Sequence, residues 1–200
     1  MAADILWTEP DEPVATLVLA HGAGAAMDSV GMNQLADALA SRGIRTARFE
    51  FGYMAARRQG SRPFPPKAET LVGEYLAAVE QVTAQGGGTP FIGGRSMGGR
   101  VATLLADELG PPGVVCFGYP FHPPAKPEQL RTAHLEHLRT PVLICQGTRD
   151  EFGTRDEVVA YTLSPAIEIE WIEGATHGLS TKAALATAAD ACKEFLTRGK

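Results

Sequence analysis

The sequence has few cysteines and no long apolar segment. Its 200 residues include only Cys116, Cys145 and Cys192, and no two of them form a Cys-x-x-Cys pair. Cysteines so widely spaced, in apolar or helical surroundings, are typical of buried thiols in a reducing compartment. No apolar run approaches the roughly 20 residues that a membrane-spanning helix needs. These absences argue against a disulfide-bonded secreted protein and against an integral membrane protein.

Positive charge is also scarce. The chain has 18 Lys and Arg residues against 23 Asp and Glu residues, a net charge of −5 and a pI near 5.5. A nucleic-acid-binding protein needs a basic face, so we expect no nucleic-acid partner. The first residues, MAADILWTEPDEP, carry acids where a secretory signal peptide has basic and then apolar residues. We therefore expect a cytoplasmic protein that does not associate with membranes.

Short apolar runs alternate with helical patterns along the chain, whose length suits one domain, residues 1–200. Buried strands are predicted at 15–20, 44–51, 90–94, 113–119, 141–147 and 167–173, with an edge strand at 5–7. Helices are predicted at 30–42, 67–85, 97–109, 156–162 and 181–197. This alternation predicts an α/β fold, in which helices cover both faces of a mostly parallel sheet of six or seven strands.

A serine follows one predicted strand at the point where a predicted helix begins. It is Ser96, in the pattern Gly-Arg-Ser-Met-Gly of residues 94–98. In such sheets ligands bind beyond the carboxyl ends of the strands. The pattern G-x-S-x-G at a strand-to-helix turn exposes the hydroxyl in a strained conformation, which the flanking glycines make room for. We predict that Ser96 is a nucleophile.

Two backbone N–H groups are expected to stabilise negative charge beside this hydroxyl. The first is that of Met97, at the start of the helix. The second is expected from the loop after the strand 15–20, His21-Gly22-Ala23-Gly24, and we assign it to Ala23, with Gly22 as the alternative. A phosphate-binding glycine loop is the competing interpretation, but the segment lacks the P-loop lysine and the dinucleotide-binding spacing. His21 is predicted to be structural.

A serine hydroxyl needs a neighbouring base, which a carboxylate orients. His177 lies late in the chain, in the loop GATHG after the last predicted strand. Asp150 follows the preceding strand, and Glu151 and Asp156 compete with it, although an acid at 156 also suits the first turn of a helix. We predict that His177 is the base and Asp150 its orienting acid.

Three further histidines raise the alternative of a metal site. They are His122, His134 and His137, the last two being three residues apart in a segment that could be helical. No carboxylate or cysteine completes the set at ligand spacing, so we expect neither a metal nor another cofactor.

The segments HGAGA, GGRSMGG, GYPFHPP, QGTRDEFG and GATHG, in this order, resemble the α/β-hydrolase superfamily near its dienelactone-hydrolase-like branch. More narrowly, GYPFHPPAKPEQLRTAHL and QGTRDEFGTRDEV resemble a compact family. It contains testis-expressed hydrolase-like proteins and the hydrolase-like domain of a nonspecific-lethal complex subunit. The resemblance covers about residues 14–196. It implies the α/β-hydrolase fold, with Ser96, Asp150 and His177 at the triad positions. Larger relatives insert a lid after the strand 113–119, and the short segment here implies a site without a large lid.

The loops 52–67 and 120–132 are basic and rich in proline. Stiff basic loops beside a nucleophile favour a substrate with a carboxylate or phosphate. The residues that we predict to contact substrate are Gly22, Tyr53, Arg57, Arg58, Arg62, Phe121 and His122. A solvated surface is the alternative for the arginines, and plain core for the aromatic residues. Arg95 and Arg100, which flank the serine turn, are predicted to be internal struts paired with an acid.

These residues predict a carboxylesterase or thioesterase that acts on a small or medium acyl substrate through an acyl-enzyme. The alternative is a binding or assembly protein that keeps a hydrolase scaffold without activity, because one branch of the resembling family serves in a chromatin assembly. Transfer of the acyl group to an acceptor other than water would use the same residues. The sequence does not indicate an oligomeric state.

Overall fold

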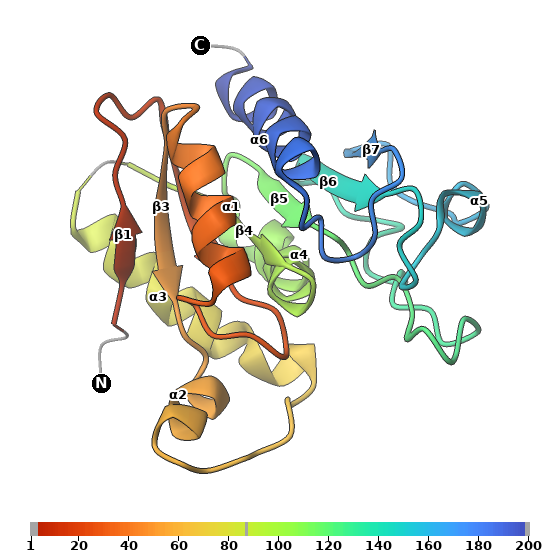
Figure 1. Cartoon of the computed structure of the whole chain (residues 1–200), viewed down its shortest axis with the longest axis horizontal. Coiled ribbons are helices and arrows are strands. Elements are labelled where there is room, and N and C mark those ends of the chain that lie inside the picture. The colour runs from red at the N-terminus through yellow and green to blue at the C-terminus, as the bar shows by residue number, and fades with distance from the viewer. Residues whose placement is uncertain (1–3, 87, 199–200) are drawn as a thin grey trace.

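The computed structural model describes residues 4–86 and 88–198, which contain one seven-stranded sheet of order β1-β3-β2-β4-β5-β6-β7 (Figure 1). The strands are β1 (Leu6–Thr8), β2 (Ala15–Ala20), β3 (Ile44–Phe49), β4 (Phe91–Arg95), β5 (Val114–Phe117), β6 (Val142–Gly147) and β7 (Ile167–Ile172). Strand β1 is antiparallel to β3, and every other pairing is parallel. With its covering helices, this sheet has the α/β-hydrolase architecture that the sequence predicts.

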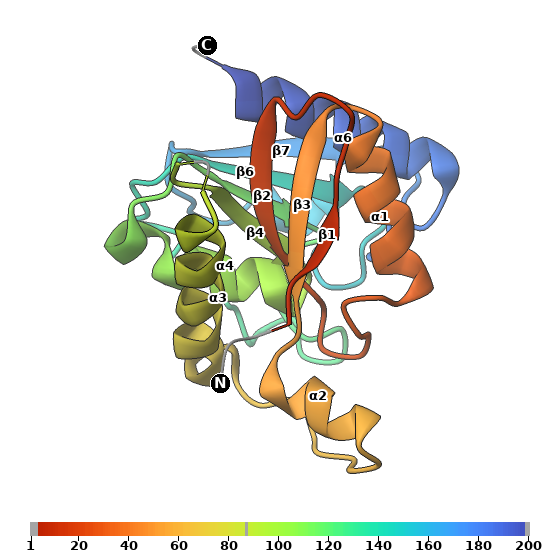
Figure 2. The same cartoon turned by 90° about the vertical axis from the view of Figure 1, so that its left-hand side faces the viewer.

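Helices cover both faces of the sheet (Figure 2). On one face α1 (Val30–Ala40) and α6 (Lys182–Thr197) pack side by side, and on the other α3 (Val72–Ala84) packs beside α4 (Met97–Leu109). Three shorter elements complete the described part of the chain: α2 (Gly52–Arg58), the 3₁₀ turn η1 (Ala68–Leu71) and α5 (Arg155–Val158). Among the described residues, no helix has the length and apolar character that crossing a membrane requires.

Strand β2 shows why the apolar runs form the centre of the sheet. Leu17 and Leu19 face α1 and α6, while Val18 and Ala20 face α3 and α4, and all four side chains are fully buried. Successive side chains of a strand point to opposite faces, so a strand covered on both sides must be apolar at every position. Burial of each leucine contributes roughly 1.5–3 kcal/mol.

The predicted strands agree with the observed ones to within about two residues, but two helices differ. Residues 67–85 divide into η1 and α3, and 156–162 contains only part of the single turn of α5. Helix α2 lies in a segment predicted to be a loop. It buries only Met54, so it lacks the apolar stripe by which a helix is predicted from sequence.

The order of the strands creates a crevice at their carboxyl ends. From β2 the chain continues to β3 on one side, and later returns to β4 on the other side of β2. Loops that leave adjacent strands in opposite directions leave room for a ligand between them. Residues 118–141, between β5 and β6, contain no helix or strand, so no lid domain is inserted there. The loops after β2 and β4 therefore meet at an open edge of the sheet.

Candidate active site

Ser96 occupies the sharp turn between β4 and α4. Its φ of 51° and ψ of −116° place a non-glycine residue in the left-handed region, which costs of order 1–3 kcal/mol. The surroundings hold it there: its N–H donates to the carbonyl of Phe117 at 3.1 Å, and its carbonyl accepts from the N–H of Arg100 at 3.1 Å. The strain is thus offset by bonds to the adjacent strand and to the following helical turn.

The glycines on both sides of Ser96 allow close packing of backbone. A Cβ at Gly98 would lie 2.5 Å from the carbonyl oxygen of Ala20, in β2. A Cβ at Gly94 would collide with the backbone of Gly98. The first turn of α4 could therefore not approach β2 and β4 with any larger residue at these positions, which explains the G-x-S-x-G pattern physically.

Ser96, His177 and Asp150 form one chain of hydrogen bonds. His177 Nε2 lies 2.8 Å from Ser96 Oγ. His177 Nδ1 lies 2.8 Å from Oδ2 and 3.0 Å from Oδ1 of Asp150, whose side chain is fully buried. A proton on Nδ1 donated to the carboxylate leaves Nε2 free to accept the serine proton. The structure thus brings together the three side chains that the sequence predicts, from the ends of β4, β6 and β7.

Two residues that sequence reasoning missed hold this chain in place. Gln146, the penultimate residue of β6, donates from Nε2 to Asp150 Oδ2 at 2.9 Å and accepts the N–H of Tyr119 at 2.7 Å. The Phe152 N–H donates to Asp150 Oδ1 at 2.8 Å, and its ring lies 4.1 Å from the His177 ring, centroid to centroid. In the sequence, the one indication of this role was a glutamine at the end of the apolar run PVLICQG, because a buried amide needs hydrogen-bond partners.

The predicted oxyanion donors lie beside Ser96. Ala23 and Met97 both line the cleft that contains Ser96 and His177. Within the described part of the chain, neither backbone N–H has an acceptor. A Cβ added to Gly22 would lie 3.6 Å from the Cβ of Ser96, so the loop after β2 approaches the serine closely. Two unpaired donors from different elements therefore border the space above the hydroxyl.

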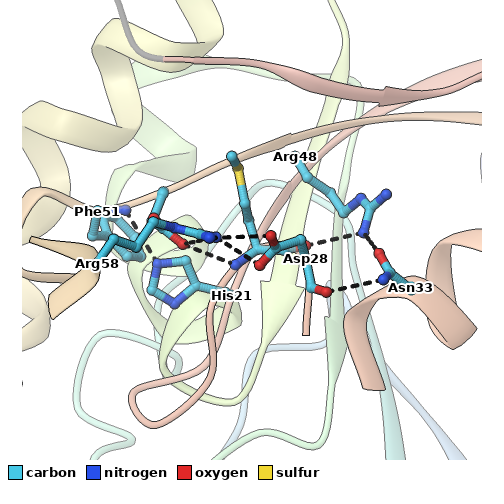
Figure 3. A network of polar contacts seen from close by, with 8 residues as sticks. His21, Asp28, Asn33, Arg48, Phe51 and Arg58 are labelled. Atoms are coloured by element: carbon cyan, nitrogen blue, oxygen red, sulfur yellow. Dashed lines mark hydrogen bonds and ion pairs between the residues drawn. The ribbon is translucent and has the colours of Figure 1, made fainter. Parts of the chain in front are cut away.

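A buried histidine anchors the start of this loop (Figure 3). His21 Nδ1 lies 2.7 Å from the carbonyl oxygen of Gly22, and Nε2 accepts the N–H of Phe51 at 3.1 Å. This pairing requires the proton on Nδ1, so the ring is neutral. Burial lowers the pKa of His21, which agrees with the neutral form. His21 is structural, as predicted.

Charged side chains hold the far end of the same loop (Figure 3). The guanidinium of Arg58, in α2, is paired with the carboxylates of both Asp28 and Glu50. Glu50 also accepts the N–H of Met27 at 3.2 Å, and Arg48 donates to the carbonyl of Met27 at 3.0 Å. The loop that supplies Ala23 is therefore fixed at both ends.

The cleft beside Ser96 has a volume of about 590 Å³ and is open to solvent. Of the predicted substrate contacts, only Gly22 lines it. The predicted substrate contact is wrong for the three arginines of loop 52–67: Arg57 donates to the carbonyl of Pro63 at 2.8 Å, Arg58 pairs with Asp28 and Glu50, and Arg62 borders a separate hollow. Lys67, at the end of that loop, does line the cleft.

The predicted aromatic contacts also lie elsewhere. The hydroxyl of Tyr53 donates to the carbonyl of Ala23 at 3.1 Å, so it holds the loop after β2 and does not line the cleft. Phe121 and His122 are buried, with His122 Nε2 3.5 Å from Glu157. In the described residues, no group of three or more His, Cys, Asp and Glu side chains is placed to hold a metal ion.

The two arginines that flank the serine turn both line the cleft. Arg100 is paired with Glu69, as predicted for a strut. Arg95 departs from that prediction, because it donates to the carbonyl of Gly31 at 3.1 Å and has no carboxylate partner among the described residues. Lys67 and Arg131, which belong to the two loops predicted to be basic, line the same cleft.

The sheet order, the strained serine turn and the hydrogen-bonded serine, histidine and aspartate define an α/β hydrolase. The chain belongs to the alpha/beta hydrolase domain family, whose model matches residues 13–198.

Solved structures show the same fold at low sequence identity. A lidless α/β serine hydrolase from Xanthomonas campestris matches with a TM-score of 0.74 and 19% identity, covering 99% of this chain and 91% of that one. Dienelactone hydrolase from Anabaena variabilis matches with a TM-score of 0.71 and 18% identity, covering 98% and 97%. An esterase domain from Rhodothermus marinus matches with a TM-score of 0.69 and 18% identity, covering 96% and 90%.

Proposed function

We propose that the protein is a serine hydrolase that cleaves carboxylic esters or thioesters of small to medium acyl groups. The observation that carries the proposal is the hydrogen-bonded chain from Ser96 Oγ through His177 to the buried Asp150. A hydroxyl at a strained turn, an imidazole in the accepting tautomer and a carboxylate that orients it are the parts that acyl transfer to serine requires.

In the proposed mechanism, Ser96 Oγ attacks the carbonyl carbon of the substrate while His177 Nε2 takes the hydroxyl proton. The N–H groups of Ala23 and Met97 stabilise the oxyanion of the tetrahedral intermediate. The intermediate then collapses: His177 gives the proton to the departing alkoxide or thiolate, and the acyl group remains bound to Ser96 as an ester. Water, activated by His177, hydrolyses this ester. Asp150 keeps the ring oriented and stabilises its positive charge throughout.

Several observations support this proposal over an inactive scaffold. The cleft at Ser96 is open, so a substrate and the hydrolytic water can both reach the serine. Similar folds include an esterase domain and a dienelactone hydrolase. We also propose that the protein belongs with the compact family of testis-expressed hydrolase-like proteins that its sequence resembles. We propose a cytoplasmic location, which the free, buried cysteines favour.

The test is steady-state hydrolysis of para-nitrophenyl butanoate. Replacement of Ser96 by alanine should lower kcat by a factor of about 10⁴ or more, because the nucleophile is lost. Ser61→Ala, at an exposed serine, is the matched control and should keep full activity. Wild-type protein that is folded but inactive, or activity that survives Ser96→Ala, would contradict the proposal and favour the binding scaffold.

A further inference from the structure

The cleft beside Ser96 is lined by cations and by no carboxylate. Among the described residues, its charged lining side chains other than His177 are Lys67, Arg95, Arg100 and Arg131. The whole chain has a net charge of −5, so this concentration of positive charge runs against the composition. A cleft lined by charges of one sign raises the local concentration of ligands of the opposite sign.

Arg100 follows the serine in the first turns of α4. It lies one helical turn after Ser96, whose carbonyl accepts its backbone N–H at 3.1 Å. Its guanidinium is paired with Glu69 through one nitrogen, but Nε is buried and has no hydrogen-bond partner among the described residues. A buried donor without an acceptor lowers the stability of the fold. This arginine therefore has an N–H group that no described residue of the protein accepts.

Arg131 lies near Arg100 and makes the local charge more positive. It is half-buried and has no carboxylate at ion-pair distance among the described residues. Burial, and after it the like charge of Arg100, lowers the pKa of Arg131. Lys67 lines the same part of the cleft. Three cations therefore share one carboxylate, that of Glu69. Two of them, Arg100 and Arg131, are half-buried, and like charges held together there are destabilising unless an anion joins them.

We propose that Arg100, Arg131 and Lys67 form a subsite for an anionic group of the substrate, a carboxylate or a phosphate. This inference rests on the proposed function, because it assigns the substrate class of that site. The subsite takes only Lys67 from the basic loop 52–67. Arg57 and Arg58 of that loop are held by a backbone carbonyl and by two carboxylates. An arginine fork binds either anion through two parallel hydrogen bonds.

The test compares two esters with the same six-carbon acyl chain, the neutral para-nitrophenyl hexanoate and the anionic mono-para-nitrophenyl adipate. Wild-type kcat/KM should favour the anionic ester by about tenfold to hundredfold. Arg131→Gln should remove most of this preference, and Arg131→Lys, which keeps the charge, should retain part of it. Arg62→Gln, outside the cleft, should leave it unchanged. Inhibition of hexanoate hydrolysis by adipate and by inorganic phosphate distinguishes the two anions.

Several outcomes would overturn the subsite. The subsite is overturned if the wild type does not prefer the anionic ester. It is also overturned if Arg62→Gln and Arg131→Gln lose the preference equally. In both cases Ser96-dependent hydrolysis of the hexanoate ester would leave the proposed function intact. If neither ester is turned over, the proposed function fails instead. Calorimetric titration with adipate and phosphate then decides the subsite: binding to wild type but not to Arg131→Gln supports it, and no binding of either anion overturns it.

Discussion

His134 is a histidine that its surroundings keep uncharged. Its Nε2 lies 2.9 Å from the hydroxyl of Thr103, and the hydroxyl of Tyr119 lies 3.5 Å away. Burial, and after it the charge of Arg100, lowers the pKa of His134 to about 4, from an ordinary value near 6.5. It therefore adds no positive charge to the neighbouring arginines at neutral pH.

This shift predicts how stability depends on pH. Below about pH 6.5 the unfolded chain protonates residue 134, whereas the folded chain does so only near pH 4, so stability falls as the pH drops through that window. Removing the group with His134→Gln should weaken this loss by on the order of 1–3 kcal/mol. Denaturant unfolding of both proteins at pH 7.5 and 4.5 measures it. Parallel losses in the two proteins would show that residue 134 does not contribute.

Helix α2 is short, yet it is bonded to the loop to which we assign one oxyanion donor. Through Arg58 it joins Glu50, at the end of β3, to Asp28, near the end of the loop after β2. The hydroxyl of Tyr53, also in α2, bonds the carbonyl of Ala23. The helix therefore links the loop that carries Ala23 to the sheet.

Arg58→Gln should loosen the oxyanion loop without unfolding the protein. The pair with Asp28 is exposed and contributes little, but the Glu50 side chain is only 8% exposed and loses its partner, so the free energy of unfolding should fall by about 1–3 kcal/mol. A misplaced donor also slows catalysis, and kcat for para-nitrophenyl butanoate should fall by about tenfold. Arg42→Gln, which breaks an ion pair with the exposed Asp190, is the control for activity. Equal activities of the two variants would refute a role of the network in positioning the loop.

The strands, the serine turn and the three site residues could be predicted because each depends on a short local sequence pattern. A central parallel strand must be apolar on both faces, which marks residues such as 15–20 directly. The serine turn needs glycine at 94 and 98, where backbone atoms would collide with a Cβ. The acid and the histidine follow because the ends of parallel strands meet at one edge of the sheet.

What could not be predicted depends on contacts between distant segments. The arginines of α2 looked available for a substrate, but Asp28 and Glu50, from other loops, pair with Arg58. Arg131 belongs to a loop that the sequence marks as basic, but only the fold places it with Arg100 at the cleft. Gln146 is one polar residue at the end of an apolar strand, and its role appears only once Asp150 is seen beside it.

The central claim is that His177 activates Ser96. The most direct measurement is the rate at which a fluorophosphonate probe phosphonylates the serine, with loss of fluoride, followed by peptide mapping. Wild-type protein should carry the label on the peptide that contains Ser96, and His177→Ala should react about a thousandfold more slowly, because its hydroxyl has no base. Equal labelling rates in the two proteins, or a label on a peptide without Ser96, would contradict the claim.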